Sequence, residues 1–218
     1  KDALEVIFQS FCRYDCDILL YDAGVCGNYS SVSVYNNIAD NKVYDQLLVN
    51  DLYRELISCN IPNNICLKAV RRKCINLPER FKDIHQVRYG EDLIMSACFI
   101  SSCKRVTYIK QGLYYYRNRP GSAVNSFNIH RSESIKIVHT EIEKQIEELG
   151  LLNLKPLHNS RKVKGWIDCV ILLLKNLKVV GKQEFFRQIK SMAEDEYFIK
   201  AYQEMDCNSL SIKRRIIA

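Results

Sequence analysis

The stretch RYGEDLIMSACFI, residues 88–100, places two adjacent carboxylates at the start of an apolar segment with helical spacing. Acids in the first turn of a helix face its unpaired backbone N–H groups and the positive end of its dipole. The pattern therefore predicts a helix that begins at Glu91 and runs to about Ser102. Capping is one interpretation of Glu91 and Asp92, and removal of a proton from a substrate is the other. The local pattern alone leaves both open.

Composition limits the class of protein. The chain has 218 residues, 47% of them hydrophobic and 26% charged, which excludes a disordered or fibrous protein. No apolar run approaches the ~20 residues that span a bilayer; the longest, residues 165–180, contains Asp168, Lys175 and Lys178 and reads as a buried helix. The net charge of +7 suits an anionic partner such as a nucleotide diphosphate, a nucleic acid or an acidic membrane face.

The ten cysteines do not form a recognisable metal or disulfide framework. They include no Cys-x-x-Cys and no histidine at zinc-site spacing. We interpret them as reduced thiols in a cytosolic protein. The string Asp15-Cys16-Asp17 resembles a metal-binding acid-x-acid motif, but it precedes the neighbouring apolar run instead of following it. We therefore interpret it as a turn between a helix and a strand.

Hydrophobic periodicity predicts an α/β part followed by an all-helical part. Before residue 130 we expect helices over 2–13, 41–58 and 91–102, a buried strand over 16–22, an edge strand over 31–35, and two strands over 104–109 and 113–117 that flank Lys110-Gln111-Gly112. After it we expect amphipathic helices over 132–149, 160–180 and 182–204, with a break near Asp195. The predicted fold class is thus a mixed sheet with flanking helices followed by a helical region, in domains 1–130 and 131–218.

The order of these features closely resembles a known family. A helix and a "DILL" strand are followed by "NNICLKAVRRKCI" and then by "LPERFKDIHQVRYGEDLIMSACFISSCKRVTYIKQGLYYYRNRPGSAVNSF". This arrangement resembles the C-terminal half of the catalytic domain of glycosyltransferase family 2, inverting enzymes with a GT-A fold, over residues 2–130. The resemblance implies an incomplete GT-A type mixed sheet that forms the acceptor side of such a domain.

The resemblance assigns roles to the acidic pair. It implies that Asp92 is the general base that takes the proton of the acceptor hydroxyl, and that Glu91 orients the acceptor or holds the helix start. A carboxylate in a partly desolvated cleft gains the basicity that this role needs.

Four further residues receive candidate roles from the resemblance. Arg117 and Ser122 match a loop that closes over the donor diphosphate, where a guanidinium and a hydroxyl suit a leaving group that gains negative charge. Arg119 is a neighbouring candidate for the same role. A surface arginine at a strand end is the alternative for Arg117. Lys68 matches an acceptor-side lysine, although Cys66-Leu67 replaces the Trp-Asn that precedes it in the family.

The implied reaction moves a sugar from a nucleotide-diphosphate sugar to the hydroxyl of a glycan or a lipid-linked acceptor, in bacterial surface polysaccharide synthesis. Family members hold a divalent cation, Mg or Mn, with an acid-x-acid motif upstream of the helix that this chain has at 2–13. That motif is missing from this sequence. We therefore expect a fragment that is inactive alone and has no measurable affinity for nucleotide sugars.

Two further interpretations concern partners. The basic amphipathic end, residues 209–218, suits either an anionic membrane surface or a solvated helix that packs on the domain. We expect a cytoplasmic protein, with a peripheral position at the inner face of the membrane under the first interpretation. The alternative to an enzyme is a non-catalytic basic helical module for binding or assembly. Nucleic acid is not expected as a partner, because the basic residues are dispersed and no nucleic-acid motif occurs.

Overall fold

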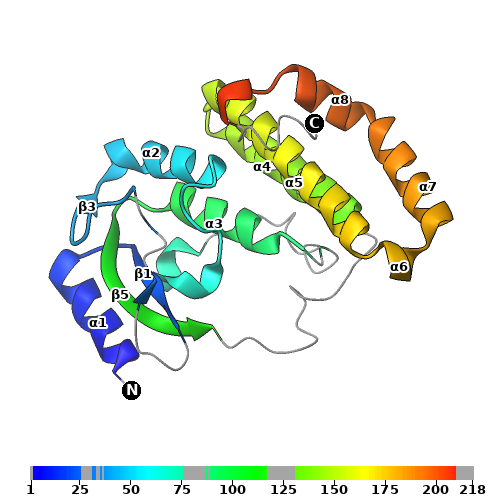
Figure 1. Cartoon of the computed structure of the whole chain (residues 1–218). Coiled ribbons are helices and arrows are strands. Elements are labelled where there is room, and N and C mark those ends of the chain that lie inside the picture. Colours follow the sequence, from blue (N-terminus) through cyan, green and yellow to red (C-terminus); the bar gives the residue numbers. More distant parts are fainter. Residues whose placement is uncertain are drawn as a thin grey trace. The chain divides into compact units, whose positions relative to one another are not determined.

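The computed structural model describes residues 2–25, 31–32, 35, 37–75, 87, 89–116 and 131–209. The chain divides into two compact units (Figure 1). The sheet unit consists of Lys1–His85 and Glu91–Pro120, and the helical unit consists of Gln86–Gly90 and Gly121–Ala218. The predicted fold class, a mixed sheet with flanking helices followed by a helical region, is confirmed. The predicted division at residue 130 stays a prediction.

Strand β1 (Ile18–Val25) is central to a five-stranded mixed sheet. It pairs in parallel with β5 (Val106–Tyr116) along its whole length. On its other edge it pairs antiparallel with β4 (Lys68–Val70) at one end and with β2 (Ser31–Val32) at the other. The short strand β3 (Val43–Tyr44) pairs antiparallel with β5 and completes the sheet.

Residues 106–116 form one continuous strand, β5, so the prediction of two separate strands was wrong. The pairing of β5 with β1 is irregular in the middle: Tyr21 pairs with Ile109, but Asp22 pairs with Gly112. The backbone N–H of Lys110 donates to Asp40 Oδ1 at 2.8 Å. The residues that read as a turn are thus an irregularity within a continuous strand, which bends the strand without ending it.

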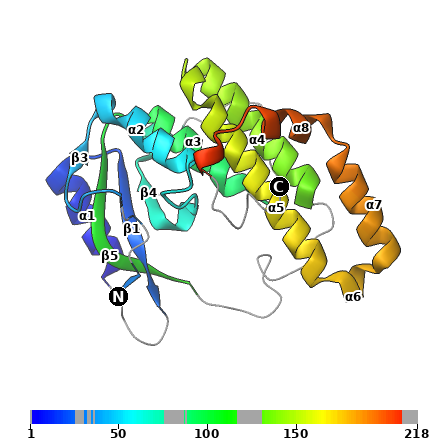
Figure 2. The same cartoon turned by 45° about the horizontal axis from the view of Figure 1, so that its top comes forward.

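Helices cover both faces of the sheet, as Figures 1 and 2 show. Helix α1 (Ala3–Tyr14) packs its apolar side on the β1 residues Leu19 and Tyr21. Helices α2 (Gln46–Ile57) and α3 (Glu91–Ser102) pack on each other on the other side. The predicted helices at 2–13 and 91–102 are confirmed. The one predicted at 41–58 begins later, because Val43 and Tyr44 form β3.

Two short 3₁₀ turns, η1 (Ile65–Leu67) and η2 (Arg72–Cys74), flank β4. They connect α2 with the segment that leads to α3, and η1 comes directly before Lys68, the first residue of β4.

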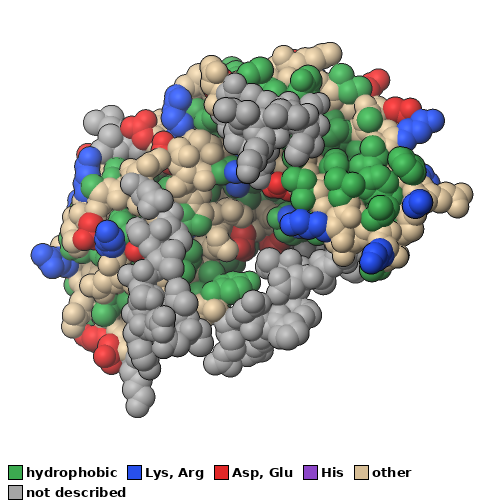
Figure 3. Space-filling model, in the orientation of Figure 1, with side chains coloured by type: hydrophobic (Ala, Val, Ile, Leu, Met, Phe, Trp, Pro, Cys, Tyr) green, Lys and Arg blue, Asp and Glu red, His purple; other side chains and the backbone are tan. Residues whose placement is uncertain are grey.

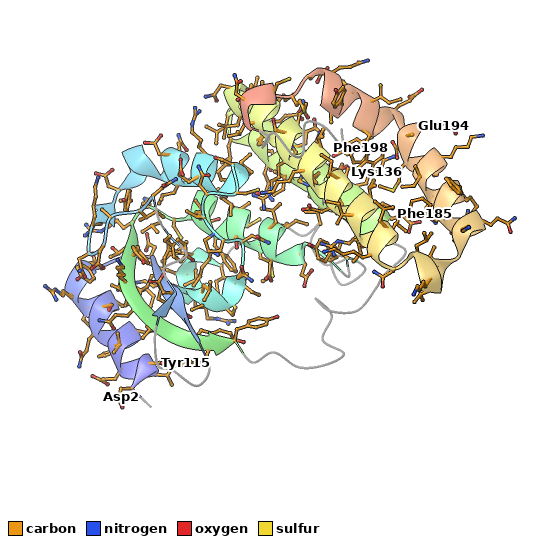
Figure 4. The ribbon with its side chains drawn as sticks, viewed as in Figure 1. Asp2, Tyr115, Lys136, Phe185, Glu194 and Phe198 are labelled. Atoms are coloured by element: carbon orange, nitrogen blue, oxygen red, sulfur yellow. The ribbon has the colours of Figure 1, made fainter. Side chains whose placement is uncertain are left out.

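The helical unit consists of amphipathic helices around a small apolar core. Its elements are α4 (Arg131–Glu148), η4 (Leu152–Leu154), α5 (Lys155–Lys175), α6 (Leu177–Val180), α7 (Lys182–Ala193), α8 (Glu196–Gln203) and η5 (Cys207–Ser209). The predicted break near Asp195 is confirmed: its carboxylate accepts the N–H of Tyr197 at 3.0 Å and caps α8. Lys136 and Phe198 lie among the facing side chains of α4, α5 and α8 (Figure 4).

Some apolar side chains of the helical unit remain exposed. Val179, Phe186 and Leu174 are 80%, 66% and 52% exposed. On the face drawn in Figure 3, hydrophobic side chains gather between α5 and α7, with Lys and Arg side chains around them. Within the described ranges, none of the helices combines the length and apolar character that a membrane crossing requires.

Two histidines are buried together in the helical unit. His139 of α4 and His158 of α5 are 5% and 1% exposed, and Nδ1 of the first lies 3.0 Å from Nε2 of the second. Burial lowers the pKa of both rings well below the ordinary histidine range, and the charges of Arg161 and Lys162 on α5 act in the same direction. Only one of the two facing nitrogens can carry a hydrogen, so the two rings cannot both be protonated, and burial disfavours a charge on either of them.

We therefore expect acid to destabilise the chain through this pair. The folded pKa values lie below the unfolded value of about 6.5, so the stability they support is present above pH ~6.5 and is lost as the pH falls below it. Between pH 7.5 and 5.5 the free energy of unfolding should fall by about 3 kcal/mol more in the wild type than in a His139→Gln/His158→Gln double variant. Urea unfolding followed by fluorescence of the single tryptophan, Trp166, measures this difference. An equal fall in both proteins would contradict the prediction.

Candidate functional site

Asp92 lies in the first turn of α3 with a partly buried side chain. The backbone turns directly before the helix at Gly90, whose φ of +94° is in the left-handed region that favours glycine. The N–H of Ile65 donates to the Asp92 carboxylate. Burial raises the pKa of Asp92, and the neighbouring charge of Glu91 adds to this; the Ile65 N–H and the charge of Lys68 lower it, but by less. Asp92 is therefore a stronger base than an exposed aspartate.

Lys68 is the cationic neighbour of this carboxylate. Its side chain is buried, and its Nζ donates to the carbonyl oxygens of Pro62 at 2.9 Å and Asn64 at 2.8 Å. Burial lowers the pKa of Lys68 to about 7, although the negative charge of Asp92 favours the ammonium form. Because Lys68 gains or loses its proton near pH 7, the positive charge near Asp92 depends on the pH in this range.

Ser96, on α3, binds the same segment as Lys68. Its hydroxyl donates to the carbonyl oxygen of Asn63 at 2.6 Å. Three consecutive carbonyl groups are therefore bound by two buried side chains, Lys68 and Ser96. The next backbone N–H after them, that of Ile65, is the one that meets Asp92.

A second buried polar contact lies in the sheet. Tyr108 donates its hydroxyl to Asp22 Oδ2 at 2.8 Å, and both residues are buried in the sheet. The ring of Tyr35 lies 5.1 Å from that of Tyr108, and its hydroxyl donates to the carbonyl oxygen of Leu67 at 3.3 Å. These contacts connect the 3₁₀ turn that carries Cys66 to the centre of the sheet.

The structure brings together three of the six predicted site residues. Asp92 and Glu91 are adjacent on α3, and Lys68 acts on Asp92 electrostatically within the same compact unit. Arg117, Arg119 and Ser122, predicted for the donor diphosphate, lie outside the described residues. So does most of the basic C-terminal segment, residues 210–218.

Sequence reasoning missed Ser96 and the carbonyl group of Asn63. Ser96 reads as one small residue in an apolar helix, and its partner is 33 positions away. A backbone carbonyl has no signal in a sequence. The one available hint was the position of Ser96, one helical turn after Asp92 and hence on the same side of α3.

The string Asp15-Cys16-Asp17 has a structural role, as predicted for a turn. Asp17 Oδ2 accepts the backbone N–H groups of Lys104 at 3.0 Å and Arg105 at 3.2 Å, and Lys73 Nζ lies 3.2 Å from Oδ1. Asp15 is exposed and ends α1 with a φ of +43°. The oxygens of Asp17 are thus occupied, and these two acids do not fit a cation site. Elsewhere in the described part of the chain, no group of three or more His, Cys, Asp or Glu side chains is placed to hold a metal ion.

Comparisons with known proteins give a distant structural match. No protein-family profile matches the chain, and no curated protein matches it by sequence. Among the solved structures that match is S. aureus TarS 1-349 in complex with UDP-GlcNAc, at 11% sequence identity and a TM-score of 0.46. The match covers 95% of this chain and 65% of the TarS chain. The chain thus has a distant structural similarity to TarS and spans 65% of the length of that TarS chain.

The two acids of the turn provide a test of its structural role. Asp17→Ala leaves two backbone N–H groups without their charged acceptor and should lower the free energy of unfolding by about 2–3 kcal/mol. The matched control Asp15→Asn alters only an exposed pair with Arg71 and should change it by less than about 0.5 kcal/mol. Urea denaturation followed by circular dichroism distinguishes the two. Similar losses for both variants would show that Asp17 does not hold this turn.

Proposed function

We propose that this chain is the acceptor-side part of an inverting, family 2 glycosyltransferase, which moves a sugar from a nucleotide-diphosphate sugar to an acceptor hydroxyl. One observation carries the proposal. At the start of α3, where the sequence resemblance puts the general base, Asp92 is partly buried and its pKa is raised. Capping alone does not need a carboxylate with increased proton affinity, because a capping acid works best when it is fully ionised.

In the proposed reaction the acceptor oxygen attacks the anomeric carbon on the face opposite the diphosphate. The proton of the acceptor hydroxyl passes to a carboxylate oxygen of Asp92 while the bond from the anomeric carbon to the diphosphate oxygen breaks. The bonding electrons leave with the diphosphate, and the configuration inverts. A base with a raised pKa takes the proton more readily as the oxygen becomes acidic in the transition state.

The neighbouring groups have supporting roles in this proposal. The charge of Glu91 raises the proton affinity of Asp92, and we assign Glu91 the orientation of the acceptor. Arg117, Arg119 and Ser122 are proposed to bind the departing diphosphate. Mg or Mn is proposed for the complete enzyme, with ligands other than Asp15 and Asp17. Bacterial surface polysaccharide synthesis at the cytoplasmic side of the membrane is the proposed setting.

The test is Asp92→Asn in the gene product that contains this chain. The amide keeps the size of the side chain and an acceptor for the Ile65 N–H, but it cannot take a proton, so transfer should fall by roughly 10²–10⁴-fold. Release of nucleoside diphosphate from a panel of nucleotide sugars, in the presence of acceptor glycans, measures the rate.

The matched control is Asp51→Asn, at an exposed position on α2, which should leave the rate unchanged. If Asp92→Asn folds with an unchanged melting temperature and transfers sugar at the wild-type rate, Asp92 is not the base. An absence of transfer by the wild-type gene product itself would favour the non-catalytic binding module.

A further inference from the structure

We propose that Ser96 and Lys68 are positioning residues for Asp92: together they fix the backbone before Ile65 so that its N–H stays directed at the carboxylate. The importance of this arrangement for sugar transfer rests on the proposed function. The arrangement itself does not, and it can be tested without any substrate.

The first support is the way in which the segment is held. The backbone of Asn64, with φ −57° and ψ 118°, is in neither a regular helix nor a regular strand conformation, and the ring of Pro62 restricts its own φ. Lys68 takes the carbonyl groups of Pro62 and Asn64, at 2.9 and 2.8 Å, and Ser96 takes the one between them at 2.6 Å. Three successive carbonyl groups are thus bound by side chains from two elements, β4 and α3, which restricts the rotation of this segment.

The second support is the origin of the two side chains. Ser96 lies four residues after Asp92 in α3, so both project from the same side of one helix. Because Ser96 binds Asn63 and Asp92 meets the N–H of Ile65 two residues later, a single helix sets the position of the carboxylate and of its donor. Lys68 adds a third point from β4.

The third support is that burial of the Lys68 ammonium group costs free energy. Lys68 is only 7% exposed, and its burial lowers its pKa to about 7. Burial of an ammonium group is unfavourable unless its contacts compensate for it. An apolar residue would fill the space at a lower cost, but it would neither bind the two carbonyl groups nor place a positive charge near Asp92.

The consequence concerns the proton affinity of Asp92. Burial and the charge of Glu91 favour the protonated carboxyl group, whereas the Ile65 N–H and the charge of Lys68 favour the carboxylate. A segment that is free to move would weaken the N–H donation and shift this balance toward the protonated form. Ser96 therefore influences Asp92 through the backbone segment that it binds, and it carries no charge itself.

The experiment is a titration of the aspartate carboxyl groups of the whole chain by carbon-13 NMR, with Asp92→Asn used to assign the Asp92 signal. In Ser96→Ala we expect the titration midpoint of Asp92 to rise by about one pH unit, the effect of one backbone N–H donor. In Lys68→Met the midpoint should rise further, because the positive charge is lost as well. The matched control is Ser101→Ala on the same helix, whose hydroxyl binds only the carbonyl oxygen of Cys98; its midpoint should not move.

A folded Ser96→Ala protein with the wild-type midpoint would overturn the proposal. If this variant does not fold, a second measurement, on the wild-type protein, tests the proposal. The proton chemical shift of the Ile65 amide must change with pH at the titration midpoint of Asp92. An Ile65 shift that stays constant there would also overturn the proposal. Wild-type transfer by Asp92→Asn, in contrast, would remove the proposed function and leave these NMR results unchanged, so the two failures can be told apart.

Discussion

The parallel pairing of β1 with β5 is the interaction on which the position of the candidate site depends. It joins residues 18–25 to residues 106–116, and α3, which carries Glu91 and Asp92, ends only a few residues before β5 begins. Asp17 strengthens this junction because its carboxylate accepts two N–H groups from the connection between α3 and β5. The helix that presents the acidic pair is therefore held at its far end by the sheet, and at its beginning by the contacts of Asp92 and Ser96.

The candidate site places opposing effects on one carboxyl group. Withdrawal from water increases the proton affinity of Asp92, and the neighbouring Glu91 increases it further, while one N–H donor and one buried ammonium group reduce it. Such a balance responds to small displacements, because electrostatic interactions are stronger where water is excluded. This sensitivity is the physical reason why the contacts that hold the segment around Asn63 matter for Asp92.

Buried titratable groups occur in both units, but they have different consequences. His139 and His158 are almost completely enclosed, so their displaced pKa values act on the stability of the helical unit. Asp92 is only partly buried, and its carboxyl group can exchange a proton with a molecule from outside. Perturbed pKa values thus point to function only where the group is also accessible.

Local signals in the sequence determined much of this protein. The acids at Glu91 and Asp92 predicted the start of α3, Asp195 predicted the break between α7 and α8, and the order of apolar segments predicted the fold class, because capping and periodicity act over a few neighbouring residues. Tertiary structure decided the rest: the continuity of β5 depends on its pairing with β1, and the roles of Lys68 and Ser96 depend on carbonyl groups that only the fold brings to them. Contacts between distant positions have no periodic pattern, and backbone groups are the same at every residue, so neither can be recognised before the chain is folded.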